Sequence, residues 1–103
     1  MLEKLLGKKS NLFDLIIIGG SGAACAAGIY AARSGLKTMV LTDSFGGQLL
    51  LTESIENYPG YIYLSGIEMA KKMEEHLKSY KEVQINEGEK VTKLEKTSKG
   101  FKA

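Results

Sequence analysis

The sequence predicts an α/β fold with a parallel sheet, followed by short C-terminal strands. Three observations predict it: the aliphatic run FDLIII at 13–18, the glycines and alanines that follow at once, and a second apolar run, KTMVLT, at 37–42. A strand, a helix and a strand in this order form a parallel unit, whose crossover is expected to be right-handed.

The first unit follows from its local composition. Residues 13–18 are aliphatic and β-branched, which is typical of a strand buried on both faces of a parallel sheet. Residues 22–34 are rich in alanine and predict a helix that ends at Gly35, in a left-handed cap. Residues 37–42 predict the second strand.

The second half is expected to hold a long loop, one helix and short strands. Segment 43–66 contains glycines and the single proline, which predicts an irregular course. A helix is predicted from Ser65, because apolar residues recur at helical spacing and Glu68 stands three residues after this cap. Apolar and polar residues then alternate over 83–103, with Val91 in one of the strands. The last strand stops short, so we expect an incomplete domain.

Length and composition limit the chain to one modest domain. Its 103 residues are 44% hydrophobic and 25% charged, with a formal net charge of +2, so no nucleic-acid partner is expected. The single cysteine, Cys25, excludes an internal disulfide and a C-x-x-C pair. No run is long enough to cross a bilayer. We expect a cytoplasmic protein with no metal and no membrane partner, with a leader over 1–12 and the domain over 13–103.

The strand-to-helix turn GGSGAA at 19–24 is expected to hold a nucleotide pyrophosphate, as in a Rossmann-like fold. In the pattern G-x-G-x-x-G/A, Gly19 takes the first place, Ser21 the second and Ala24 the third. The Ser21 hydroxyl can donate to a phosphate oxygen. The alternative is an ordinary glycine-rich turn of any α/β domain.

Three separated motifs together resemble one family. The stretch 14–43, followed by FGGQLL at 45–50 and IENYPG at 55–60, resembles the N-terminal part of the low-molecular-weight thioredoxin reductases and of the flavoprotein component of alkyl hydroperoxide reductase. The resemblance covers about residues 13–91. It implies the first part of an FAD-binding domain, with the NAD(P)H domain and the closing FAD segment elsewhere. It also implies a homodimer that passes electrons from NADPH or NADH through FAD to a cysteine pair and on to thioredoxin or a similar disulfide protein.

The resemblance also implies which residues contact FAD. Those of the pyrophosphate turn are Gly19, Gly20, Ser21, Gly22, Ala23 and Ala24. At the end of the second strand, Thr42 holds the place of the ribose-binding carboxylate and Asp43, the favoured candidate, follows it. Those expected at the flavin are Gly46, Gly47, Gln48, Leu49 and Asn57, and the Val91 backbone would meet adenine. Each could instead be a turn, capping or core residue.

Two other functions stay open at this point. The chain could be a truncated stand-alone nucleotide-binding module without catalytic activity, or the NAD-binding domain of a dehydrogenase, in which the motifs at 45–50 and 55–60 would have no role. No catalytic residue is predicted: Cys25 lies among alanines and is expected to be buried and inert. By itself, the chain is expected to be catalytically silent.

Overall fold

The computed structural model describes residues 12–103, so the predicted leader lies outside the described residues apart from Leu12. The elements are β2 (Leu15–Ile18), α1 (Gly22–Arg33), β3 (Thr38–Thr42), the 3-10 helix η1 (Gly47–Leu51), α2 (Gly66–Lys78), β4 (Val83–Glu87), β5 (Glu95–Thr97) and β6 (Gly100–Lys102). Neither α-helix of this part of the chain combines the length and apolar character that crossing a membrane requires.

The predicted α/β architecture with a parallel sheet is confirmed. The strand order is β2-β3-β4, and both neighbouring pairs are parallel. Ile17 lies beside Val40, and Val40 lies beside Ile85, so aliphatic side chains form a row across the sheet. The alternating tail thus supplies the third parallel strand, β4, as well as a separate antiparallel hairpin of β5 and β6.

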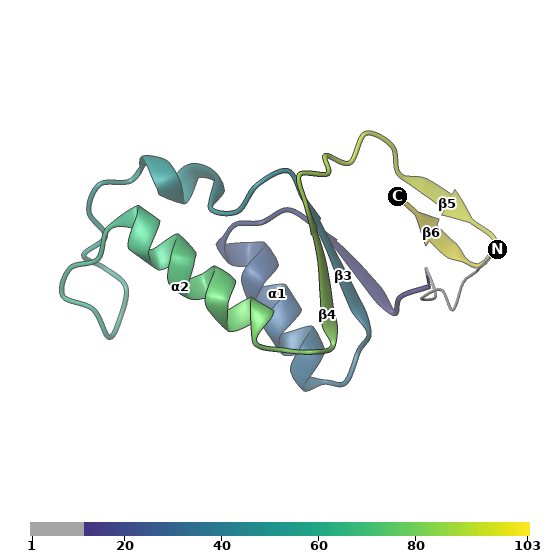
Figure 1. The fold of residues 1–103 in the computed structure, drawn as a ribbon, viewed down its shortest axis with the longest axis horizontal. Coiled ribbons are helices and arrows are strands. Elements are labelled where there is room, and N and C mark those ends of the chain that lie inside the picture. The colour runs from purple at the N-terminus through teal and green to yellow at the C-terminus, as the bar shows by residue number, and fades with distance from the viewer. Residues whose placement is uncertain (1–11) are drawn as a thin grey trace.

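The hydrophobic core lies between the sheet and the two α-helices, which cover one of its faces (Figure 1). Val40 from β3 and Leu77 from α2 are fully buried there, with Cys25 from α1 and Phe45 from the following loop. Gly28 lets the helices approach, since a Cβ atom at this position would lie 2.5 Å from the Leu77 Cδ1 atom. The core therefore fixes α1, and with it the turn that precedes α1, against the sheet.

The end of α1 and the start of α2 lie where the sequence predicts them. Gly35 follows α1 with a φ of +79°, the left-handed conformation expected of a glycine cap. At the start of α2, Glu68 donates its backbone N–H to the Ser65 hydroxyl, and the Glu68 carboxylate accepts from the Ser65 N–H. This reciprocal capping box satisfies two amides that the helix itself leaves without partners.

The prediction that Val91 lies in a strand is wrong. After β4 the chain turns at Gly88, whose φ is +86°, and the Gly88 and Glu89 amides donate to the carbonyls of Asp43 and Thr42. This turn directs the chain away from the sheet, and residues 89–94 run without strand pairing to the β5–β6 hairpin at the far end of the molecule (Figure 1).

Candidate functional site

The predicted pyrophosphate turn lies at the carboxyl end of β2, directly before α1. Gly19 has a φ of +130°, and its N–H donates to the Leu41 carbonyl of β3 at 2.9 Å. Ser21 is the N-cap residue of α1, yet its side chain makes no capping hydrogen bond within the described residues. The first turn of α1 also lacks an acidic residue. The N-terminal amides of this twelve-residue helix are therefore suited to an external anion.

A second glycine segment, Gly46–Gly47, packs directly against this turn. The Gly46 N–H donates to the Gly20 carbonyl at 3.0 Å, and the Ser21 hydroxyl donates to the Gly46 carbonyl at 3.1 Å. Both glycines have positive φ, +104° and +53°. Two predicted site segments that lie 25 residues apart in sequence are thus joined by hydrogen bonds of opposite direction.

The end of β3 completes one side of the turn. Thr42 is buried, and its hydroxyl donates to the Ser44 carbonyl at 2.7 Å. A Cβ atom at Gly20 would lie 2.5 Å from the Thr42 Oγ1 atom and 2.7 Å from the Ser44 oxygen. The Thr42 hydroxyl proton is therefore committed within the protein, whereas the neighbouring Asp43 is exposed. Of the two ribose candidates, Asp43 is the one that faces solvent.

Gln48 and Leu49 lie on η1, a short 3-10 helix inside the segment expected to be irregular. Gln48 is exposed and Leu49 is partly buried. The Leu49 carbonyl lies against Gly66, where a Cβ atom would be only 1.8 Å from its oxygen, and the Gly66 N–H donates to the Thr52 carbonyl. The start of α2 thus supports the loop that carries Gly46–Gly47, a role that the sequence did not suggest.

Asn57 lies apart from this junction. It is exposed in a loop that the Ile55–Leu64 bridge closes, and no hydrogen bond within residues 12–103 joins it to the glycine turn. The adjacent Tyr58 lines a hollow together with Gly22 of α1. This places the loop beside the first turn of α1, while the flavin contact predicted for Asn57 stays a prediction.

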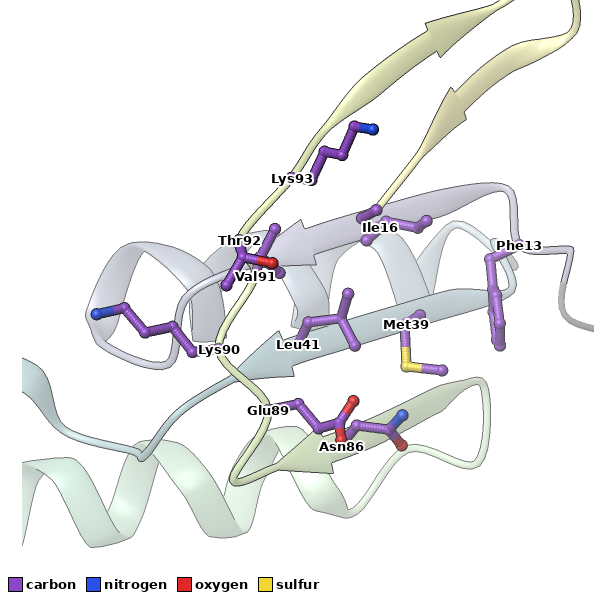
Figure 2. Close-up of a pocket in the computed structure, with 11 residues that line it drawn as sticks. Phe13, Ile16, Met39, Leu41, Asn86, Glu89, Lys90, Val91, Thr92 and Lys93 are labelled. Carbon is purple, nitrogen blue, oxygen red and sulfur yellow. The ribbon is translucent and has the colours of Figure 1, made fainter.

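Val91 lies on the face of the sheet opposite the helices. It lines a hollow of about 340 Å³ with Leu41 and Asn86. Figure 2 shows Val91 and Thr92 on the segment that passes over the carboxyl halves of β2 and β3. Because the Glu89 amide is bonded to the Thr42 carbonyl, Val91 stands close to the end of β3 that also carries Asp43.

The single cysteine has the properties of a core residue. Cys25 is buried in the core. Burial raises the pKa of its thiol, and the nearby Glu74 carboxylate raises it further, so the reactive thiolate is disfavoured.

Phe45 is an anchor of the second glycine segment that the sequence reasoning did not single out. Its ring is buried in the core beside Val40 and Leu77, immediately before Gly46. A lone aromatic residue ahead of two glycines is the signal that could have identified it.

Known proteins resemble this chain in sequence and in fold. The sequence profile of the family described as pyridine nucleotide-disulphide oxidoreductase matches residues 13–103. An NADH dehydrogenase of Ferdinandcohnia aciditolerans is 39% identical over 84 residues, which are 82% of this chain and 16% of that protein. A component of the alkyl hydroperoxide reductase of Pseudomonas aeruginosa is 41% identical over 92 residues, 89% of this chain and 17% of the relative. The crystal structure of T. acidophilum thioredoxin reductase superposes with a TM-score of 0.80 at 37% identity, covering 86% of this chain and 29% of the other. The chain thus spans less than a third of each of these proteins.

Proposed function

Because the chain belongs to the pyridine nucleotide-disulphide oxidoreductase family, we propose that it forms the FAD-binding part of a flavoprotein related to the thioredoxin reductases. The resemblance seen in the sequence motifs is confirmed at the level of the family, whose matching members include alkyl hydroperoxide reductase components and thioredoxin reductases.

The observation that carries the proposal is the joining of two glycine segments at the start of α1. The Gly46–Gly47 segment and the Gly19–Ser21 turn share two hydrogen bonds, and a Cβ atom at Gly20 would have no room. These contacts fix the turn directly before α1, whose first amides have no partner within the helix and lie at the positive end of its dipole, where a doubly charged pyrophosphate is favoured. The residues present therefore fit a dinucleotide such as FAD.

Each part of the site has its own task in this proposal. The amides of Gly22, Ala23 and Ala24 at the start of α1 would hold the pyrophosphate. The exposed Asp43 carboxylate would accept from the ribose hydroxyls, with Val91 beside the adenine.

The flavin end is assigned to the residues after β3. These are Gly46, Gly47, Gln48 and Leu49 on and before η1, and Asn57 in the following loop. Glycines at 46 and 47 let the backbone approach a planar ring closely.

The chemistry of the whole protein is proposed by class. When bound, FAD supplies the hydride and electron transfer that links NADH or NADPH to a protein disulfide such as that of thioredoxin. The 103 residues contain a single cysteine, which is buried. These residues therefore cannot supply the cysteine pair that such a reaction uses. The names of the relatives support this class, and we further propose a homodimer in a reducing cytoplasm.

Isothermal titration of the chain with FAD and with NAD tests the proposal. We expect saturable binding of FAD and none of NAD; binding of NAD alone would favour a dehydrogenase domain instead. Asp43→Ala should weaken FAD binding about 10- to 100-fold, because a charge-assisted hydrogen bond is lost. Glu53→Ala, which removes an exposed carboxylate after η1, is the matched control and should leave the affinity unchanged. Equal affinities for both variants would remove Asp43 from the site.

A further inference from the structure

Ser21 occupies the place where the dinucleotide pattern has its second glycine. A serine at a helix N-cap ordinarily accepts a hydrogen bond from an amide of the first turn. Ser21 makes no such bond within the described residues, and its hydroxyl instead donates to the Gly46 carbonyl at 3.1 Å. The side chain is therefore directed at the second glycine segment.

Gly46 is held through both of its backbone polar groups by adjacent residues of the turn. Its N–H donates to the Gly20 carbonyl, and its carbonyl accepts from Ser21. The next residue, Gly47, is in close contact with the same serine, since a Cβ atom at Gly47 would lie 3.3 Å from the Ser21 Cβ atom. The conformation of Gly46–Gly47 is thus tied to residues 20 and 21.

The chemistry of a hydroxyl group decides between two roles for Ser21. A hydroxyl carries a single proton, and here that proton is used in the bond to Gly46. The pyrophosphate of a dinucleotide is a fully ionised diester that offers acceptors only. A serine that already donates elsewhere has nothing left to give it. The lone pairs of the hydroxyl do not help, because the pyrophosphate has no proton to share.

We infer that Ser21 is a positioning residue that fixes the Gly46–Gly47 segment against the pyrophosphate turn, and that it is not a phosphate ligand. The inference rests on the proposed function in one respect, that Gly46–Gly47 serves the flavin end of FAD. A glycine at position 21 would leave the Gly46 carbonyl without this donor. The departure from the glycine pattern thus connects the pyrophosphate end of the site to the flavin end.

The first test needs no cofactor. In Ser21→Ala the Gly46 and Leu49 amides, which donate to the Gly20 and Gly46 carbonyls, should exchange with deuterium about 2- to 12-fold faster, the equivalent of one net hydrogen bond. Ser79→Ala is the matched control: its hydroxyl also donates to a backbone carbonyl, that of His76, at the far end of α2. Unchanged exchange at Gly46 and Leu49 in Ser21→Ala would overturn the inference.

The second test compares FAD with ADP-ribose, which has the same adenosine and pyrophosphate but no flavin. Ser21→Ala should weaken FAD binding several-fold and leave the affinity for ADP-ribose within about 2-fold of the wild type. Ser21→Gly, which also takes away the Cβ atom, should give the same pattern. Equal weakening of both ligands would identify Ser21 as a phosphate ligand and refute the positioning role. If the wild-type chain binds neither ligand, the proposed function fails, and the exchange experiment still decides the role of Ser21.

Discussion

Two glycines of the strand-to-helix turn, Gly20 and Gly22, should respond differently to the same substitution. A Cβ atom at Gly20 would lie 2.5 Å from the Thr42 Oγ1 atom and 2.7 Å from the backbone oxygen of Ser44. A Cβ atom at Gly22 would meet the Met73 sulfur at 3.6 Å, which is ordinary van der Waals contact. Neither glycine has a positive φ, so the space around each, and not backbone strain, sets the difference.

The size of the effect at Gly20 follows from what must move. Overpacking a tight site costs about 1–3 kcal/mol. The added methyl group would also displace the Thr42 hydroxyl from the Ser44 carbonyl, a bond of 2.7 Å, which costs about 0.5–1.5 kcal/mol more. We therefore expect Gly20→Ala to lower the free energy of unfolding by about 2–4 kcal/mol. Gly22→Ala should change it by less than about 1 kcal/mol, since alanine suits a helix better than glycine.

Urea and thermal unfolding followed by circular dichroism measure both variants. A loss of about 2 kcal/mol corresponds to a decrease in Tm of about 8 °C or more in a domain of this size. Adding Thr42→Ala to Gly20→Ala removes the nearest obstacle, the Thr42 hydroxyl, but leaves the Ser44 carbonyl in place. The double variant should therefore lose less free energy of unfolding than the sum of the two single losses. If Gly20→Ala and Gly22→Ala unfold within about 0.5 kcal/mol of each other, the packing argument is refuted.

Four further predictions concern the helices. Ser65→Ala should cost about 1 kcal/mol in urea unfolding, because it removes the cap of α2. The Ser65 N–H and hydroxyl hold the pKa of Glu68 below its usual value, so its contribution to stability is present at neutral pH and is lost as the pH falls through the lowered pKa. Glu68→Gln should therefore flatten the decline in Tm below about pH 5, and an unaltered decline would contradict this. The Cys25 thiol should react with a disulfide reagent far more slowly in the folded chain than in urea; equal rates would show that it is not buried. Leu77→Ala should lower the free energy of unfolding by about 2–5 kcal/mol, since Leu77 is fully buried, and a loss under about 1 kcal/mol would place it outside the core.

The regular elements were predictable because local signals and packing agree in them. The aliphatic run before Gly19, the alanine-rich helix with its Gly35 cap and the Ser65 capping box each form as the sequence indicates. Boundaries shifted by a few residues, since β2 spans only Leu15–Ile18 of the predicted 13–18. In these segments the hydrophobic period and the end signals point to the same structure.

The parts that could not be predicted depend on pairing between distant residues. The alternation over 83–103 does not say which of its strands joins the parallel sheet. The pairing of β4 with β3, which is distant in sequence, decides this. Val91 falls outside any strand because the Gly88 and Glu89 amides bond back to the end of β3. The role of Ser21 was equally out of reach, since its acceptor is 25 residues away.

The room for a side chain at each position explains where the glycines stand in this turn better than the dinucleotide pattern does. In the usual fingerprint the second glycine lets the backbone approach the phosphate. Here the position with no room for a side chain is Gly20, one place earlier, where the chain packs against Thr42 and Ser44. Position 21 has room for a small side chain because the residue packed against it is Gly47. A Cβ atom at Gly47 would lie 3.3 Å from the Ser21 Cβ atom. A side chain at 47 would therefore need Ser21 to shift by a few tenths of an ångström, away from its contact with the second glycine segment. The φ of +53° at Gly47 disfavours most side chains there as well, so Gly47→Ala should destabilise this packing for two reasons, the contact with Ser21 and backbone strain.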